Sequence, residues 1–173
     1  MNNRSPTEKK FENHIEKYLN SKEFKSFYFE RYDRTLCLIK DEVLNFIKST
    51  QKEKWDKLQD IHGDDVENKV LSRISSEISR RGVIDVFRNQ VSDRSVYLDL
   101  CYFEPKSELN PEHLSLFQSN KFSLVRQLHY SNQNENSIDM VLFLNGIPIV
   151  TMELKNQLTG QNYKNSENQY RYD

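Results

Sequence analysis

The chain has 173 residues, of which 36% are hydrophobic and 29% are charged, and 25 basic against 26 acidic side chains give a formal net charge of −1. This length suits one packed core and is short for two. Near-neutral charge argues against a free-standing DNA binder that relies on an overall basic excess, although it leaves room for a local basic patch. No run of about 18 apolar residues and no secretory signal occurs, so we expect no membrane span and a cytoplasmic location.

The first half of the chain has helical periodicity. Apolar residues recur at three- and four-residue spacing over 9–19 and 34–49 and predict two helices. A third helix is predicted over 64–81, with Gly82 as its stop. We expect a single domain over 1–173 in which residues 1–82 are mainly helical and residues 83–173 carry the sheet.

The second half changes to strand patterning. Four segments show period-2 alternation or short apolar runs between turn signals. These segments are 95–105, 122–130, 137–144 and 147–155. Pro111 opens a short helix after the first of them, and Asn145-Gly146 joins the last two as a hairpin. The residues after Gly160 predict the first turns of a further helix.

Three ionisable side chains stand inside the otherwise apolar hairpin. Asp139 lies on its first arm, and Glu153 and Lys155 lie on the second. Burying isolated charges costs several kcal/mol each unless they pair or bind a cation. Carboxylate oxygens suit Mg²⁺, and the lysine would then face the negative charge of a phosphate. This pattern predicts a magnesium site, although spacing alone fits a cross-strand salt bridge better.

The register of the hairpin tests this prediction. A plain two-residue turn would place Asp139 opposite Met152, on the wrong face. A three-residue loop with Gly146 left-handed would instead place Asp139 opposite Thr151 and diagonal to Glu153. We therefore predict the longer loop or a β-bulge.

The order of elements predicts an α/β fold with a mixed central sheet flanked by helices, and with its charges it resembles the restriction-endonuclease-like PD-(D/E)xK core. Longer blocks resemble the N-terminal endonuclease domain of the type I restriction enzyme R subunit (HsdR) over nearly the whole chain. They are KWDKLQDIHGDDVENKVLSRI, RRGVIDVFRNQVSDR, LNPEHLSLFQSNKFSLVRQLHYS, SIDMVLFLNGIPIVTMELKNQLTGQ and NQYRYD.

By this resemblance Asp139, Glu153 and Lys155 are the catalytic residues. It implies Mg²⁺-dependent hydrolysis of phosphodiester bonds, with the metal on Asp139, Glu153 and the Leu154 carbonyl. Lys155 would position the attacking water or stabilise the developing charge. The resemblance also aligns Gln169 with the family's Gln-x-x-x-Tyr motif.

The end of that motif departs from the family. Asp173 stands where the family has tyrosine. Either Tyr170 or Tyr172 replaces that tyrosine as a DNA-contacting or accessory residue, or the element differs here.

The resemblance also implies partners: double-stranded DNA, a specificity subunit and a methylation subunit. Such R subunits carry an ATP-driven motor, but no Gly-x-x-x-x-Gly-Lys-[Ser/Thr] motif occurs in this chain. We therefore assign no ATP site here and expect the motor to follow in a longer protein.

Weaker candidates keep two interpretations each. Glu12 is either a further metal-binding carboxylate on the first helix or a solvated helix charge. His129 is either an accessory residue near the metal or a structural hydrogen-bonding partner. Dispersed basic residues form either a phosphate-facing surface or ordinary solvated and paired charges. These residues are Arg80, Arg81, Arg88, Arg94, Lys121 and Arg126.

Two rival functions remain beside an active nuclease. One is a nuclease-fold module without activity that binds DNA or partner subunits. The other is a structural or interaction protein in which the three hairpin charges form only a salt bridge.

Overall fold

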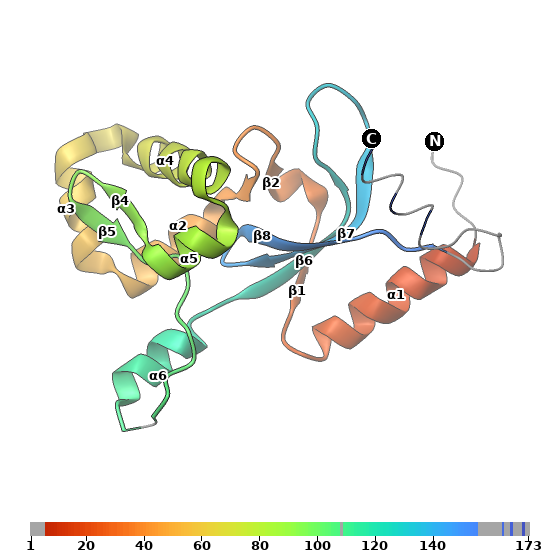
Figure 1. Ribbon diagram of the computed structural model, residues 1–173, viewed down its shortest axis with the longest axis horizontal. Helices are drawn as coiled ribbons and strands as arrows, with labels where there is room; N and C mark the ends of the chain where they lie inside the picture. The colour runs from red at the N-terminus through yellow and green to blue at the C-terminus, as the bar shows by residue number, and fades with distance from the viewer. Residues whose placement is uncertain (1–5, 108, 156–163, 165–166, 168–170, 172–173) are drawn as a thin grey trace.

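The computed structural model describes residues 6–107, 109–155, 164, 167 and 171. A four-stranded sheet in the order β1-β6-β7-β8 lies at its centre (Figure 1). The edge strand β1 (Lys25–Phe27) runs parallel to β6 (Phe122–His129). The next strands, β7 (Ser137–Leu144) and β8 (Ile147–Met152), are antiparallel. The predicted α/β fold with a mixed, helix-flanked sheet is confirmed, and it is consistent with a restriction-endonuclease-like core.

Helices lie on both sides of this sheet in Figure 1. The first helix, α1 (Pro6–Asn20), adjoins the β1 and β6 part of the sheet. A helical lobe lies beside the β7–β8 turn and includes two short strands. Its elements are α2 (Lys40–Thr50), α3 (Lys52–His62), η2 (Gly63–Asp65), α4 (Val66–Arg81), α5 (Val83–Asn89), β4 (Val91–Asp93) and β5 (Val96–Leu98). The remaining elements are η1 (Phe29–Arg31), β2 (Tyr32–Asp33), β3 (Leu38–Ile39) and α6 (Pro111–Gln118).

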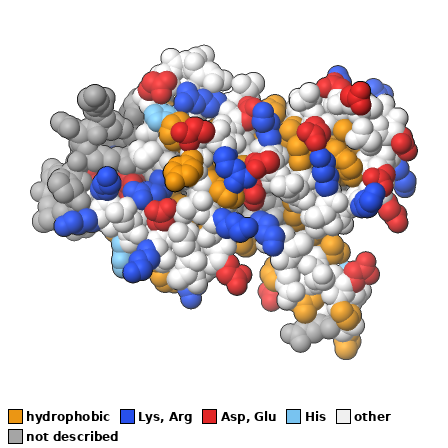
Figure 2. Space-filling view, turned by 180° about the vertical axis from the view of Figure 1, so that it is seen from behind, with side chains coloured by type: hydrophobic (Ala, Val, Ile, Leu, Met, Phe, Trp, Pro, Cys, Tyr) orange, Lys and Arg blue, Asp and Glu red, His pale blue; other side chains and the backbone are white. Residues whose placement is uncertain are grey.

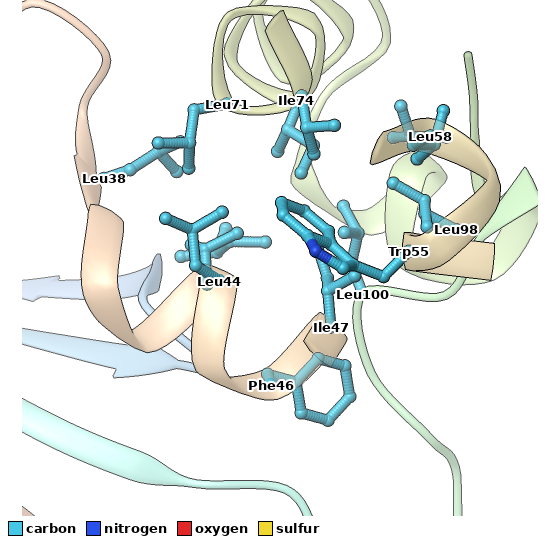
Figure 3. Packing of buried hydrophobic residues seen from close by; sticks show 14 of the residues in the cluster. Leu38, Leu44, Phe46, Ile47, Trp55, Leu58, Leu71, Ile74, Leu98 and Leu100 are labelled. Carbon is cyan, nitrogen blue, oxygen red and sulfur yellow. The ribbon is translucent and has the colours of Figure 1, made fainter. Parts of the chain in front are cut away.

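The helical lobe has its own apolar core, shown in Figure 3. Trp55 packs there among leucine and isoleucine side chains from α2, α4 and the β5 region. Ile147 of β8 belongs to the same cluster, and Val141 and Phe143 of β7 belong to a second cluster on the sheet. The hairpin therefore joins the two cores, which fixes its position by burial of apolar area on both sides.

The turn between β7 and β8 is held tightly. Asn145 and Gly146 have φ values of 51° and 82°, which are typical of a two-residue type I′ turn. A Cβ atom on Gly146 would lie 2.5 Å from the carbonyl oxygen of Ile39. The amide of Ile39 also donates to the Gly146 carbonyl at 2.9 Å. These contacts anchor the hairpin to the start of α2.

Several predicted elements have different limits in the structure. The helices over 9–19 and 64–81 and the strands over 122–130, 137–144 and 147–155 correspond to observed elements. The helix predicted over 34–49 begins only at Lys40, because Leu38 and Ile39 form β3 against β2. The strand predicted over 95–105 is limited to Val96–Leu98. In the part of the chain that the structure describes, no helix is long and apolar enough to span a membrane.

Candidate active site

The β7–β8 register decides whether the three hairpin charges share one face. The two-residue turn pairs Leu144 with Ile147, so the predicted three-residue loop is wrong. The pairing then shifts between Leu142 and Phe143, because Ile149 is the extra residue of a bulge. The predicted bulge is confirmed. Beyond it, Met140 pairs with Met152, and the same register places Asp139 across from Glu153 instead of Thr151.

Asp139 is buried, at 8% exposure, and it is held by neighbouring strands. Its Oδ2 accepts a hydrogen bond of 2.7 Å from the main-chain N–H of Leu154. Its Oδ1 accepts a longer one, 3.4 Å, from the side-chain amide of Gln127 on β6. The carboxylate is therefore oriented from both sides of β7, by Gln127 of β6 and by Leu154, two residues beyond β8.

Glu153 carries the less stabilised charge of the pair. Its side chain is 4% exposed, and Oε2 has no hydrogen-bond partner among the described residues. Burial and then the nearby negative charge of Asp139 raise the pKa of Glu153 to about 7. Lys155 opposes this shift, with its Nζ 3.6 Å from Glu153 Oε2. A buried oxygen without a donor and with a raised pKa is a place where a cation would be stabilised.

A network of polar side chains links this pair of carboxylates to α1. The Gln127 amide also donates to Glu12 Oε1 at 3.3 Å. Glu12 is 1% exposed and is paired with Arg126 at 2.7 Å. Arg126 reaches Glu16 at 2.8 Å as well. A pocket of about 470 Å³ opens beside Arg126 and Gln127 and includes Tyr28 and Phe29 in its lining.

The model of one protein family, the type I restriction enzyme R protein N terminus, matches residues 5–173. The chain belongs to this family. Searches of curated proteins and of solved structures gave no match.

The candidate site offers few side chains that could bind a metal ion. Among the residues that the structure describes, no group of three or more His, Cys, Asp or Glu side chains could hold a metal. Two carboxylates nevertheless fit Mg²⁺, which usually keeps several waters and takes one or two carboxylates together with substrate phosphate oxygens. The buried Glu153 Oε2 without a donor supports this fit.

The predicted last helix carries the residues aligned with the Gln-x-x-x-Tyr motif. Gln169, Tyr170, Tyr172 and Asp173 all lie outside the described residues. Nearby, Glu167 and Arg171 are helical and form an ion pair at 2.6 Å.

Glu12 and His129, the weaker candidates, both contact neighbouring residues of the fold. Glu12 is not a solvated helix charge, because its carboxylate is buried against Arg126 and Gln127. His129 has Nδ1 3.1 Å from the Glu135 carbonyl oxygen and its ring 5.0 Å from that of Phe29. These contacts agree with the interpretation of His129 as a structural hydrogen-bonding partner.

Three of the dispersed basic residues are paired with carboxylates. Arg80 and Arg81 pair with Glu77, and Arg126 pairs with Glu12 and Glu16. Figure 2 shows basic and acidic side chains interspersed on the face it displays. Paired arginines offer little positive potential to a phosphate, which agrees with the net charge of −1.

The sequence did not single out Gln127. Its side chain contacts Asp139, Glu12 and Ser137, and its φ is 54° within a strand. A glutamine in a strand carries no local signal for a left-handed backbone, because that conformation is imposed by neighbouring strands. Only its position opposite Asp139 in the paired sheet shows its relevance.

Proposed function

We propose that this domain is the Mg²⁺-dependent endonuclease of a type I restriction enzyme and hydrolyses phosphodiester bonds of unmodified double-stranded DNA. Membership of the R-protein N-terminal family supports a role in such an enzyme. The observation that carries the nuclease assignment is the environment of Glu153. Its carboxylate is buried, and Oε2 receives no hydrogen bond among the described residues. It lies across from the carboxylate of Asp139 and beside Lys155.

Asp139 and Glu153 would hold the ion, together with the Leu154 carbonyl. Bound Mg²⁺ supplies Lewis-acid polarisation of the scissile phosphate and lowers the pKa of a coordinated water. The hydrogen bond from the Leu154 amide keeps Asp139 Oδ2 fixed next to the Glu153-Leu154-Lys155 segment. Lys155 is 18% exposed at its side chain, so it can meet substrate while it neutralises charge that develops on the phosphate.

A purely structural salt bridge accounts less well for these contacts. Such a pair is stabilising when each buried carboxylate oxygen is satisfied. Here Glu153 Oε2 is 3.6 Å from Lys155 Nζ, has no hydrogen-bond donor in the described part of the chain, and belongs to a group whose pKa is raised to about 7. The arrangement therefore lowers the stability of the fold when no metal ion is bound.

Cleavage by the assembled enzyme tests the proposal. The R protein carrying Asp139→Asn or Glu153→Gln would be combined with the specificity and methylation subunits and given unmodified plasmid DNA, Mg²⁺ and ATP. We expect each variant to assemble and to consume ATP while cleavage is lost. Cleavage at the wild-type rate by either variant would show that the nuclease assignment is wrong, and a wild-type complex that binds but never cuts would favour the inactive module.

A further inference from the structure

Gln127 has a strained backbone in the middle of β6. Its φ of 54° lies in the left-handed region, which side chains other than Gly, Asn and Asp rarely adopt. The residues on either side pair normally with β7, Arg126 with Met140 and Leu128 with Ile138. The ladder is thus interrupted at the one position that faces Asp139. Strain of this kind persists when the surrounding structure imposes it, and it is common at functional sites.

The side chain of Gln127 uses this backbone to reach three elements. Its amide nitrogen lies 3.4 Å from both Oδ1 and the carbonyl oxygen of Asp139, and 3.3 Å from Oε1 of Glu12. Its carbonyl oxygen accepts from Ser137 Oγ at 3.4 Å. These hydrogen bonds are long and individually weak. Two of the four involve Asp139, so they orient that residue more than they stabilise the fold.

The partner of Gln127 on α1 is itself held firmly. Arg126 Nη2 and Nε donate to Glu12 Oε2 at 2.7 and 3.2 Å, and Nη1 donates to Asn13 and Glu16. Glu12 therefore offers Oε1 to Gln127 from a fixed position. Asp139 is in turn fixed on its other oxygen by the Leu154 amide. Gln127 completes a chain of contacts from α1 across β6 and β7 to Leu154, two residues beyond β8.

We propose that Gln127 is a positioning residue for the nuclease reaction, which orients the Asp139 carboxylate through its amide and connects that carboxylate to the Glu12–Arg126 pair. This inference rests on the proposed function. Groups that hydrogen-bond to a metal-binding carboxylate typically change metal affinity about 10- to 100-fold when they are removed. Replacing Gln127 by glycine would also relieve the strained backbone, so we expect that loss of this side chain does not weaken the fold.

Gln127→Gly separates positioning from stability, because glycine removes both the amide and the backbone strain. Thermal unfolding of the 173-residue chain without metal should show a melting temperature equal to or above that of the wild type. Calorimetry with Mg²⁺ should show affinity about 10-fold weaker. Gln127→Asn, which tolerates a left-handed φ but has a shorter amide, should give the same loss of affinity.

Gln90→Gly is the matched control. Gln90 also has a left-handed φ, 56°, and its amide contacts Asp99 in the helical lobe. This variant should relieve similar strain and leave Mg²⁺ affinity unchanged. Wild-type Mg²⁺ affinity in Gln127→Gly or in a folded Gln127→Asn would overturn the inference. Asp139→Asn separates a failure of the Gln127 inference from a failure of the proposed magnesium site. Wild-type Mg²⁺ affinity in Asp139→Asn would overturn the magnesium site itself.

Discussion

The main-chain N–H of Leu154 donates a hydrogen bond of 2.7 Å to Oδ2 of Asp139. The ladder between β7 and β8 has ended by this point, because β8 stops at Met152. This bond helps to keep the Glu153-Leu154-Lys155 segment beside β7. The acceptor is the first carboxylate of the proposed site, and the donor lies between Glu153 and Lys155, the other two proposed site residues.

Stability without metal should fall as pH rises, because of Glu153. Its pKa is raised from 4.5 to about 7, so the folded chain holds this proton more tightly than the unfolded chain. The resulting stabilisation is complete below pH 4.5 and is lost as pH rises through about 7, with a total on the order of 3 kcal/mol. Glu153→Gln carries no such charge. The free energy of unfolding by urea should favour this variant increasingly between pH 5 and 8, and a constant difference would contradict the assigned pKa.

The same carboxyl group predicts the pH dependence of Mg²⁺ binding. In the proposed site the metal binds ionised Glu153, so below about pH 7 its binding should displace a proton. Affinity should rise by up to about tenfold per pH unit below pH 7 and level off above it. Calorimetry in two buffers of different ionisation enthalpy would measure the proton released. A pH-independent affinity between pH 5.5 and 7 would show that Glu153 does not bind the metal.

Loss of the Lys155 side chain should slow cleavage without weakening Mg²⁺ binding. Lys155→Ala removes the positive charge near Glu153 and leaves both carboxylates in place. We expect the cleavage rate of the assembled enzyme to fall by about 10²- to 10³-fold, as for the loss of one group that stabilises transition-state charge. Mg²⁺ affinity should be retained or rise. Loss of Mg²⁺ binding together with cleavage would instead indicate that Lys155 supports the structure of the site.

Removing only one member of the Glu12–Arg126 ion pair should lower the free energy of unfolding. Arg126→Met removes the arginine that pairs with the buried carboxylate of Glu12, which is 1% exposed. Removing one partner of a buried ion pair costs about 3–5 kcal/mol. Adding Glu12→Gln to that variant should restore most of the lost stability in urea unfolding. If Arg126→Met alone changes stability by less than about 1 kcal/mol, the pair is not the buried anchor described above.

Gly146 should tolerate no side chain. In Gly146→Ala the new Cβ would meet the Ile39 carbonyl oxygen at 2.5 Å, and the residue would keep a φ of 82°. We expect a loss of about 2–4 kcal/mol from backbone strain and overpacking together. Gly63→Ala is the control, since Gly63 also has positive φ but has nothing within 4 Å of the added Cβ. Equal losses in the two variants would show that the contact with Ile39 is unimportant.

The hairpin and its bulge were predictable from the sequence because burial restricts register. Asp139 and Glu153 share a face only if one extra residue interrupts the ladder, and the structure has that residue at Ile149. The requirement for a shared face does not determine the turn type. A longer loop and a bulge on β8 shift the register by one residue in opposite directions, and either shift brings Asp139 to the face of Glu153. Asn145-Gly146 adopts the type I′ turn that its composition favours.

Other features depend on contacts between distant parts of the chain. Arg126 and Glu12 are 114 positions apart, and neither has a sequence context that indicates the other. The helix α3 was not predicted because its buried side chains are only Trp55 and Leu58, too few for a clear helical period. The segment before α2 forms β3 instead of helix, because Ile39 bonds to the β7–β8 turn. Tertiary contacts override local periodicity at each of these places.

A crystal of the chain soaked in Mn²⁺, with anomalous diffraction to locate the ion, tests the central claim most directly. Mn²⁺ prefers oxygen ligands much as Mg²⁺ does and gives an anomalous signal. We predict a single strong peak between the carboxylates of Asp139 and Glu153, at about 2.0–2.3 Å from one oxygen of each. The peak should be absent from Asp139→Asn. A wild-type crystal with both carboxylates in place and no peak between them at saturating Mn²⁺ would contradict the assignment of this site as the metal centre of a nuclease.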